Sequence, residues 1–167
     1  MVVPSQYGDL QAKIEMSAKC LSNGGVAAVP TDTLYAFAAS VFIEKSVERI
    51  FDLKGRPNNQ GMPVLLDGID RVNSCVLDIP ELALPLMQAF WPGPLTIVLR
   101  RSPAVPSVVC GGLGTVGIRV PDHELTRGIV KELDAPITGT SVNRSGTESL
   151  NSAELIANEF GDQIDLI

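Results

Sequence analysis

The stretch LQAKIEMSAKCLSNGGVAAVPTDTLY, residues 10–35, decides the fold class of this chain. Its first half places apolar residues at helical spacing, at Leu10, Ile14, Ala18 and Leu21. That spacing predicts an amphipathic helix, which Asn23-Gly24-Gly25 ends. The apolar run at 26–29 then predicts a buried strand that stops at Pro30, with hydroxyl side chains at its exit. A helix followed by a buried strand is typical of an α/β domain.

The same alternation of helix and strand continues along the chain. Apolar periodicity predicts further helices at 44–54, 80–90, 123–133 and 153–160. Apolar and β-branched runs predict strands at 62–66, 95–99, 116–120, 136–138 and 164–167. No internal repeat or linker interrupts this pattern. Residues 1–167 are therefore expected to form one α/β domain with a twisted, mixed parallel and antiparallel sheet and flanking helices.

Composition restricts the classes of function. The net charge is −6 and aromatic residues make up only 5% of the 167 residues, which does not favour nucleic-acid binding through the whole surface or an aromatic stacking platform. The three cysteines are far apart, which suits neither a disulfide framework nor a zinc site. The sequence contains no apolar run of about 20 residues and no signal peptide. We therefore expect a soluble, cytoplasmic protein with no membrane partner.

Three short segments place cationic or hydroxyl side chains beside structure-breaking residues. They are Lys54-Gly55-Arg56-Pro57, Gly117-Ile118-Arg119-Val120-Pro121 and Thr140-Ser141-Val142-Asn143-Arg144-Ser145-Gly146. Guanidinium and ammonium groups bind phosphates and carboxylates well. Because the protein as a whole is acidic, these cations are not part of a general basic surface. We interpret them as one anion-binding site assembled from distant parts of the chain.

Each segment also has a simpler explanation. Lys54 and Arg56 could be solvated charges at a helix C-terminus, where cations favour the helix dipole. Arg119 lies in an apolar strand, so its head needs an anionic partner, and an internal salt bridge is as good an explanation as a ligand. The segment 140–146 could be an ordinary turn or helix cap. The sequence has a single histidine and neither standard nucleotide-binding loop, so a catalytic triad or a Walker-type site has little support.

Taken together and in order, five segments resemble the YrdC family of threonylcarbamoyl-AMP synthases. They are Pro30-Thr31-Asp32-Thr33-Leu34-Tyr35, Lys54-Gly55-Arg56-Pro57, Trp91-Pro92-Gly93-Pro94-Leu95-Thr96, Gly117-Ile118-Arg119-Val120-Pro121-Asp122-His123, and Thr140-Ser141-Val142-Asn143-Arg144-Ser145-Gly146. Any one of these motifs is weak alone, whereas five in register are specific.

The resemblance implies a YrdC-like fold with a large, basic, concave cavity. It also implies an activity, in which L-threonine, bicarbonate (or CO2) and ATP give threonylcarbamoyl-adenylate and pyrophosphate. Partner proteins then transfer the threonylcarbamoyl group to an adenosine of certain tRNAs. Mg²⁺ is expected on the ATP phosphates, held mainly by substrate oxygens and water rather than by protein carboxylates.

The resemblance also implies roles for particular residues. Thr33 and Arg119 are expected to bind threonine, Arg119 through the carboxylate. The nucleotide and its phosphates are expected to face Lys54, Arg56, Gln60 and Thr115. The loop residues Thr140, Ser141 and Asn143 are expected to touch the substrates. No nucleophile is required, so Lys54, Arg56 and Arg119 would act by positioning and charge stabilisation.

The sequence departs from the family pattern at four places. Ala36 replaces a glycine, Val142 replaces an alanine, and Gln60-Gly61-Met62 stands where the family commonly has Lys-Pro-Leu or Asn-Pro-Leu. Gln60 keeps hydrogen bonding without the charge of a lysine. The sequence also stops at Ile167, where the family's C-terminal closing segment is expected.

Two other functions remain open from the sequence. A module that binds double-stranded RNA or tRNA could use the same basic cavity, since such RNA is recognised mainly through phosphates and shape. A related carbamoyl-adenylate-forming domain, such as that of hydrogenase maturation proteins, is disfavoured by the short length of the chain.

Overall fold

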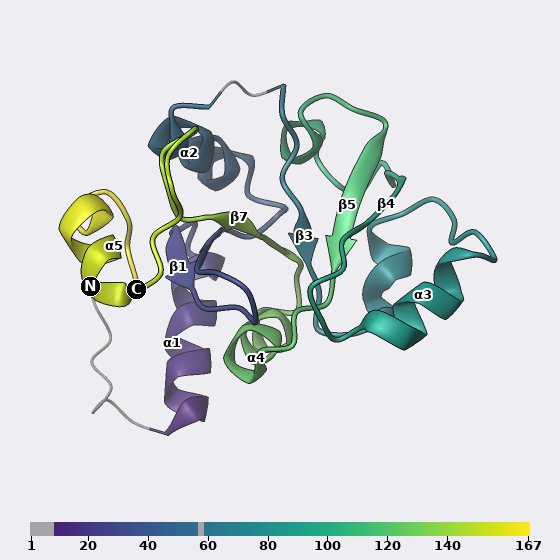
Figure 1. Cartoon of the computed structure of the whole chain (residues 1–167), viewed down its shortest axis with the longest axis horizontal. Helices are drawn as coiled ribbons and strands as arrows, with labels where there is room; N and C mark the ends of the chain where they lie inside the picture. The colour runs from purple at the N-terminus through teal and green to yellow at the C-terminus, as the bar shows by residue number, and fades with distance from the viewer. Residues whose placement is uncertain (1–8, 57–58) are drawn as a thin grey trace.

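Helices and strands alternate through the residues that the computed structural model describes, 9–56 and 59–167 (Figure 1). The helices are α1 (Leu10–Ser22), α2 (Glu44–Lys54), α3 (Ala83–Phe90), α4 (Glu124–Leu133) and α5 (Ala153–Phe160), with 3-10 helices η1 (Ile69–Ser74) and η2 (Ser107–Cys110). The strands are β1 (Ala27–Val29), β2 (Ala36–Ala38), β3 (Val64–Leu65), β4 (Ile97–Arg100), β5 (Thr115–Arg119), β6 (Ile137–Thr138) and β7 (Thr140–Ser141). Within the described ranges, no helix has both the length and the hydrophobicity that a membrane crossing needs.

The strands of the described residues form two hydrogen-bonded sections. One is antiparallel with the order β1-β2-β7, and the other has the order β4-β5-β3-β6, in which only β3 and β5 are parallel. The sections meet where β6 passes through Gly139 into β7, and the Thr138 amide donates to Ala39 beside β2 (2.9 Å). The predicted α/β domain with a mixed parallel and antiparallel sheet is confirmed.

Helices cover both faces of the β1–β2 hairpin. Ala27 and Val29 pack with residues of α1 and α4 such as Leu21 and Ile129. On the opposite face, Ala28 and Phe37 belong to the core that includes α2 and α5. The alternation of side chains along a strand explains why a short apolar run can fill two cores at once.

A glycine allows α1 and α4 to approach closely. A Cβ atom built on Gly128 of α4 would lie 2.3 Å from the Cδ1 atom of Ile14 in α1, which is too close for any larger residue without movement. Ile14 is 8% exposed, so this contact closes the core on that side. In Figure 1, α4 lies between α1 and α3.

The predicted elements differ from the observed ones at β2 and β7, at the 3-10 helices η1 and η2, and at residues 164–167. Strands β2 and β7 were not expected from the sequence, because each has three residues or fewer. Strand β2 pairs with its neighbour β1 and with the distant β7, and β7 pairs with β2. The predicted strand at 164–167 is wrong. There, Leu166 makes a single parallel bridge to Ala27, and its carbonyl accepts from the Ala28 amide (2.9 Å).

Candidate functional site

A small pocket of about 130 Å³ with a mixed polar and apolar lining opens at the junction of the two sheet sections. Its lining comes from the segment before β2, from β3, from the end of β5 and from the β6–β7 link, and comprises Thr31, Thr33, Leu34, Tyr35, Ala36, Leu65, Arg119, Gly139 and Ser141. Drug-sized ligands occupy cavities of roughly 300 Å³ or more. The pocket therefore suits a molecule the size of an amino acid, with one cation and several hydroxyl groups to recognise it.

Arg119, the last residue of β5, is held by three groups from two separate segments. Its Nε donates to the carbonyl of Gly93 (3.0 Å), and its two terminal nitrogens reach Thr33 Oγ1 (3.1 Å) and Asp32 Oδ1 (2.5 Å). The side chains of Arg119 and Asp32 are only 13% and 15% exposed, although Asp32 as a whole residue is exposed. The guanidinium is thus fixed in one orientation at the pocket wall.

The turn at Gly93 can form only with a glycine. A Cβ at this position would lie 2.4 Å from the carbonyl oxygen of Phe90. The Gly93 amide donates to Val120 (2.8 Å) while its carbonyl accepts from Arg119, so the turn docks on the end of β5. The turn between Pro92 and Pro94 therefore helps to orient Arg119.

Thr33 is positioned by a turn centred on the hydroxyl of Thr31. This hydroxyl donates to the Leu34 carbonyl (2.7 Å) and accepts from the amides of Thr33 (3.1 Å) and Leu34 (3.2 Å). Such hydroxyl-centred turns are a local alternative to regular backbone hydrogen bonding. As a result, the Thr33 side chain lies against Arg119 at the mouth of the pocket.

Lys54 points inward rather than into solvent. Gly55 ends α2 in the left-handed conformation (φ 58°), and the Lys54 residue is only 4% exposed. Its ammonium donates to the carbonyl of Ser141 (2.5 Å) and to the carbonyl and Oδ1 of Asn143 (3.2 and 2.7 Å). Burial, together with the nearby charge of Arg56, lowers the pKa of Lys54 to about 8. The ammonium form therefore still predominates at neutral pH and has three oxygen partners.

The loop after β7 is tied to the end of α2 by these contacts and by its own. The Ser141 hydroxyl donates to Asn143 Oδ1 (2.8 Å), and Asn143 Nδ2 donates to the Thr147 carbonyl (2.7 Å). The Ser145 amide donates to the Lys54 carbonyl (2.8 Å). Thr140 is buried in β7, and Ser141 is the member of this loop that lines the pocket.

The other predicted nucleotide-facing residues lie further from the pocket. Arg56 Nη2 donates to the Gly61 carbonyl (2.8 Å), while its buried Nε has no partner among the described residues. Gln60 is exposed, and Pro57 lies outside the described residues. Thr115 begins β5 on the face that carries Arg119, about 13 Å away at the usual rise of a strand.

The structure brings part of the predicted set together, and Asn143 joins it through hydrogen bonds to Ser141 and Lys54, whereas Thr140 is buried in β7. Thr33, Arg119 and Ser141 line one pocket, and Lys54 reaches it through the Ser141 carbonyl. Arg56, Gln60 and Thr115 do not line it.

Sequence reasoning assigned no role to Asp32 and Gly93, which hold Arg119. The sequence features that could have pointed to them are the position of Asp32 between two threonines and the position of Gly93 between two prolines.

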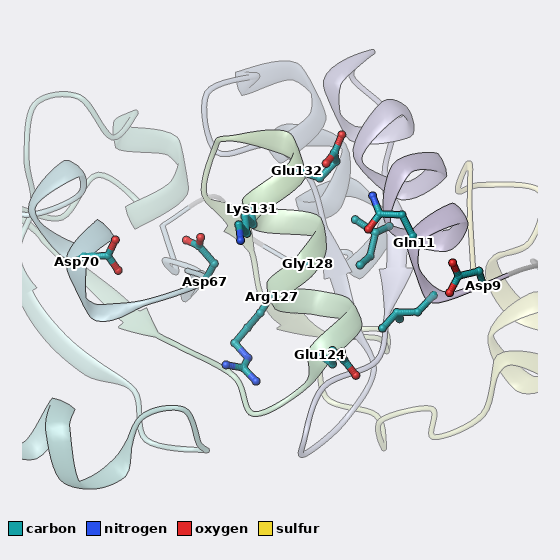
Figure 2. Close-up of a pocket in the computed structure, with 11 residues that line it drawn as sticks. Asp9, Gln11, Asp67, Asp70, Glu124, Arg127, Gly128, Lys131 and Glu132 are labelled. Atoms are coloured by element: carbon teal, nitrogen blue, oxygen red, sulfur yellow. The ribbon is translucent and has the colours of Figure 1, made fainter.

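A larger hollow of about 950 Å³ lies elsewhere, between α1, α4 and the segment around η1 (Figure 2). Figure 2 shows Asp67 and Asp70 on one side of α4 and Asp9 on the other, with Arg127 and Lys131 between them. Carboxylates outnumber cations there, and none of the predicted site residues lines it. The large basic cavity expected from the sequence is therefore not this groove.

Comparison with known proteins places the chain in a family. The Sua5/YciO/YrdC family model, described as "Telomere recombination", matches residues 19–167. The chain belongs to the Sua5/YciO/YrdC family. The resemblance inferred from the five motifs is thus confirmed.

Relatives within the Sua5/YciO/YrdC family carry a consistent name. A threonylcarbamoyl-AMP synthase of Pyrococcus abyssi is 38% identical over 93% of this chain and 46% of its own length. A threonylcarbamoyl-AMP synthase of Vibrio vulnificus is 30% identical over 93% of this chain and 85% of its own. The structure of P. abyssi Sua5 complexed with L-threonine superposes with a TM-score of 0.95 at 35% identity, covering 100% of this chain and 49% of that one. This chain thus spans about half the length of the Pyrococcus protein.

Proposed function

We propose that this chain synthesises L-threonylcarbamoyl-adenylate from L-threonine, bicarbonate or CO2, and ATP, with release of pyrophosphate. The main observation behind this proposal is the small pocket that the fixed guanidinium of Arg119 lines together with the hydroxyl side chains of Thr33 and Ser141. Support also comes from family relatives named for this activity and from a related structure complexed with L-threonine.

The pocket offers the groups that threonine recognition requires. Arg119 supplies N–H donors for a carboxylate, and the hydroxyls of Thr33 and Ser141 can exchange hydrogen bonds with the threonine hydroxyl or amine. Leu34, Ala36 and Leu65 give an apolar wall for the methyl group. A site that hydrogen-bonds a substrate hydroxyl rejects an analogue without it, here valine.

The nucleotide is assigned to the open face of β4 and β5. Thr115 and Arg119 share this face with Gly117, which has no side chain, and Val98 beside it is 64% exposed. A face about 13 Å long suits an extended ligand such as ATP. Arg56 and Gln60 would face its phosphates. For Lys54 to do the same, its ammonium would have to exchange its contacts to Ser141 and Asn143.

The reaction needs no covalent enzyme intermediate. The threonine amine adds to CO2 and releases a proton to give a carbamate, whose oxygen attacks the α-phosphorus. The bond from the α-phosphorus to the bridging oxygen then breaks, and pyrophosphate leaves. The contribution of the protein is to hold two anionic reactants together and to offset their repulsion with fixed cations.

Mg²⁺ enters the proposal as an ion bound to the ATP phosphates. Over the described residues, no group of three or more His, Cys, Asp or Glu side chains is arranged to hold a metal. The carboxylate beside the pocket, Asp32, is already engaged by Arg119. This donor set fits an ion held mainly by substrate oxygens and water.

The product would serve threonylcarbamoyladenosine formation in tRNA through partner proteins. We place this reaction in the cytoplasm, in keeping with the free thiols of Cys20, Cys75 and Cys110.

Calorimetry with threonine and ATP, separately and together, tests the proposal, followed by an assay for pyrophosphate release with bicarbonate present. We expect the wild-type chain to bind threonine and to discriminate against valine. Arg119→Ala should abolish threonine binding, whereas Arg56→Ala, which removes a cation outside the pocket, should chiefly weaken ATP binding.

Arg100→Ala is the matched control, since Arg100 lies on the adjacent strand and pairs with the exposed Asp78. It should bind threonine as the wild type does. Absence of heat with either ligand would remove the proposed function, and normal threonine binding by Arg119→Ala would remove the role of that residue.

A further inference from the structure

The guanidinium of Arg119 is already paired with a carboxylate before any ligand is considered. An arginine has five N–H donors, and the contacts to Gly93, Thr33 and Asp32 use three of them. A substrate carboxylate binds arginine best through two parallel N–H···O bonds. Such a ligand therefore competes with at least part of this arrangement.

The three contacts differ in what they supply. The Gly93 carbonyl and the Thr33 hydroxyl are neutral, come from different segments and together fix the plane of the guanidinium. Asp32 supplies the charge, at 2.5 Å and with both side chains at least 85% shielded from solvent. Since Gly93 and Thr33 hold two of the guanidinium nitrogens with neutral acceptors, the contribution particular to Asp32 is its negative charge.

We propose that Asp32 is an internal competitor for the substrate carboxylate: it pairs with Arg119 in the ligand-free protein, and a carboxylate ligand must displace it from the guanidinium. This inference rests on the proposed function only in taking the ligand to be an amino acid. It concerns the contact that sets how tightly and how selectively the pocket holds an anion.

This exchange has consequences for both stability and selectivity. An unpaired cation in so shielded a place would be costly, and Asp32 avoids this cost in the empty protein. A simple carboxylate such as acetate gains little binding free energy, because it only takes the place of the Asp32 carboxylate on Arg119. A ligand that also hydrogen-bonds to Thr33 or Ser141 gains these contacts in addition. Competition from Asp32 therefore selects against ligands that bind through a carboxylate alone.

The test compares Asp32→Asn with the wild-type chain by calorimetry. Asparagine keeps the shape and an acceptor for Arg119 while it removes the charge. We expect the Kd for L-threonine to fall by about tenfold or more, because the competing charge is gone. L-threoninol, which lacks the carboxylate, should show no such gain. Asp78→Asn, which removes the carboxylate from the exposed pair with Arg100, should leave both affinities unchanged.

An unchanged or weaker affinity of Asp32→Asn for threonine would overturn the proposal and would mean that Asp32 serves to orient Arg119. An equal gain with threoninol would overturn it too, since the effect would not depend on the carboxylate.

A second test uses the wild-type chain, so it does not depend on whether Asp32→Asn folds. In the threonine-bound structure, the contact between Asp32 Oδ1 and Arg119 should be lost. Its persistence at 2.5 Å beside a bound carboxylate would contradict the proposal.

A third measurement separates this inference from the proposed function. Acetate is titrated while the Arg119 Nε–H signal is followed by NMR, and the midpoint should lie at a lower acetate concentration in Asp32→Asn. If the wild-type chain binds no threonine, the proposed function fails, whereas the acetate titration still decides the role of Asp32. Equal midpoints in the two proteins would refute that role.

Discussion

At the scale of single residues, the pocket depends on places where a side chain is absent. Gly139 links β6 to β7, and its amide donates to the Pro63 carbonyl (2.8 Å). A Cβ atom here would lie 2.5–2.8 Å from three carbons of the Leu65 side chain, which is 1% exposed and lines the pocket. The absence of a side chain at Gly139 thus allows the Leu65 side chain to occupy its position in the pocket wall.

Replacing Gly139 by alanine should therefore affect both stability and binding. Leu65 has to move, and overpacking of this kind costs about 1–3 kcal/mol. We expect a lower free energy of unfolding in urea and weaker threonine binding by calorimetry. Gly114→Ala is the control, since nothing lies within 4 Å of a Cβ atom there. Unchanged stability of Gly139→Ala would show that Leu65 adjusts freely.

At the scale of elements, the end of α2 and the loop after β7 behave as one unit. The ammonium of Lys54 crosses from the helix to the loop, and the Ser145 amide returns to the Lys54 carbonyl. The aromatic rings below extend this contact, with Lys54 Nζ 5.9 Å from the centre of the Phe37 ring and Phe37 edge-on to Phe160 of α5. A buried ammonium thus connects α2, β2 and the loop.

The buried ammonium predicts a pH dependence of stability. The pKa of Lys54 is lowered from its ordinary 10.5 to about 8, so between these values the unfolded chain binds the proton that the folded chain has lost. The Lys54 contribution to the free energy of unfolding must then rise with pH from about 8 to 10.5. We expect the wild-type chain to gain stability relative to Lys54→Met across this interval, measured by urea unfolding.

Lys45→Met is a suitable control, because Lys45 lies in the same helix and is exposed. Its stability relative to the wild type should not change over this interval. A difference between wild type and Lys54→Met that stays constant from pH 8 to 10.5 would show that the ammonium keeps its proton in the fold.

At the scale of the whole molecule, residues near the end of the sequence hold the first strand in place. The Asp165 carboxylate accepts from the Val26 amide (2.8 Å) and from Arg49 of α2 (2.6 Å). The Asp165 amide donates back to the Val26 carbonyl (2.8 Å). Burial alone would raise the pKa of Asp165, but the Val26 hydrogen bond and the Arg49 charge hold it below its usual value.

Asp165→Ala should lower the free energy of unfolding by about 1–3 kcal/mol, because the Val26 amide loses its acceptor. The lowered pKa means that the carboxylate stabilises the fold above its unfolded pKa, and that this contribution disappears as pH falls through the folded pKa. The difference in the free energy of unfolding between Asp165→Ala and the wild type, measured in urea, should therefore become smaller at acid pH. Asp162→Ala, at an exposed position nearby, should have little effect. Equal stability of the two variants would contradict the assigned role of Asp165.

The sequence predicted the parts of the fold that depend on local pattern. Helix α1 follows from the spacing of Leu10, Ile14 and Leu21, and its end follows from the glycines after Asn23. Strand β2 and the pairing of Ala36 with Ser141 were missed. Strand β2 has only three residues, and besides its hairpin partner β1 it pairs with β7, about a hundred positions away. Long-range pairing has no local signature.

The same limit applied to the candidate site. The apolar context of Arg119 indicated that its head needs an anionic partner, but nothing local identified Asp32, 87 positions earlier. The position of Lys54 at a helix end suggested a solvated or phosphate-facing cation. The left-handed turn at Gly55 and the return of the chain at Ser145 bring the loop over its ammonium instead.

The assembly of the pocket from segments between Thr31 and Ser141 has a consequence for gene recombination. A chimera of two homologous genes that switches parent inside this interval combines pocket walls that were never selected together. A switch before Thr31 or after Ser141 transfers the complete lining from one parent. Among folded chimeras, those of the second kind should retain the ligand preference of the parent that supplies the interval.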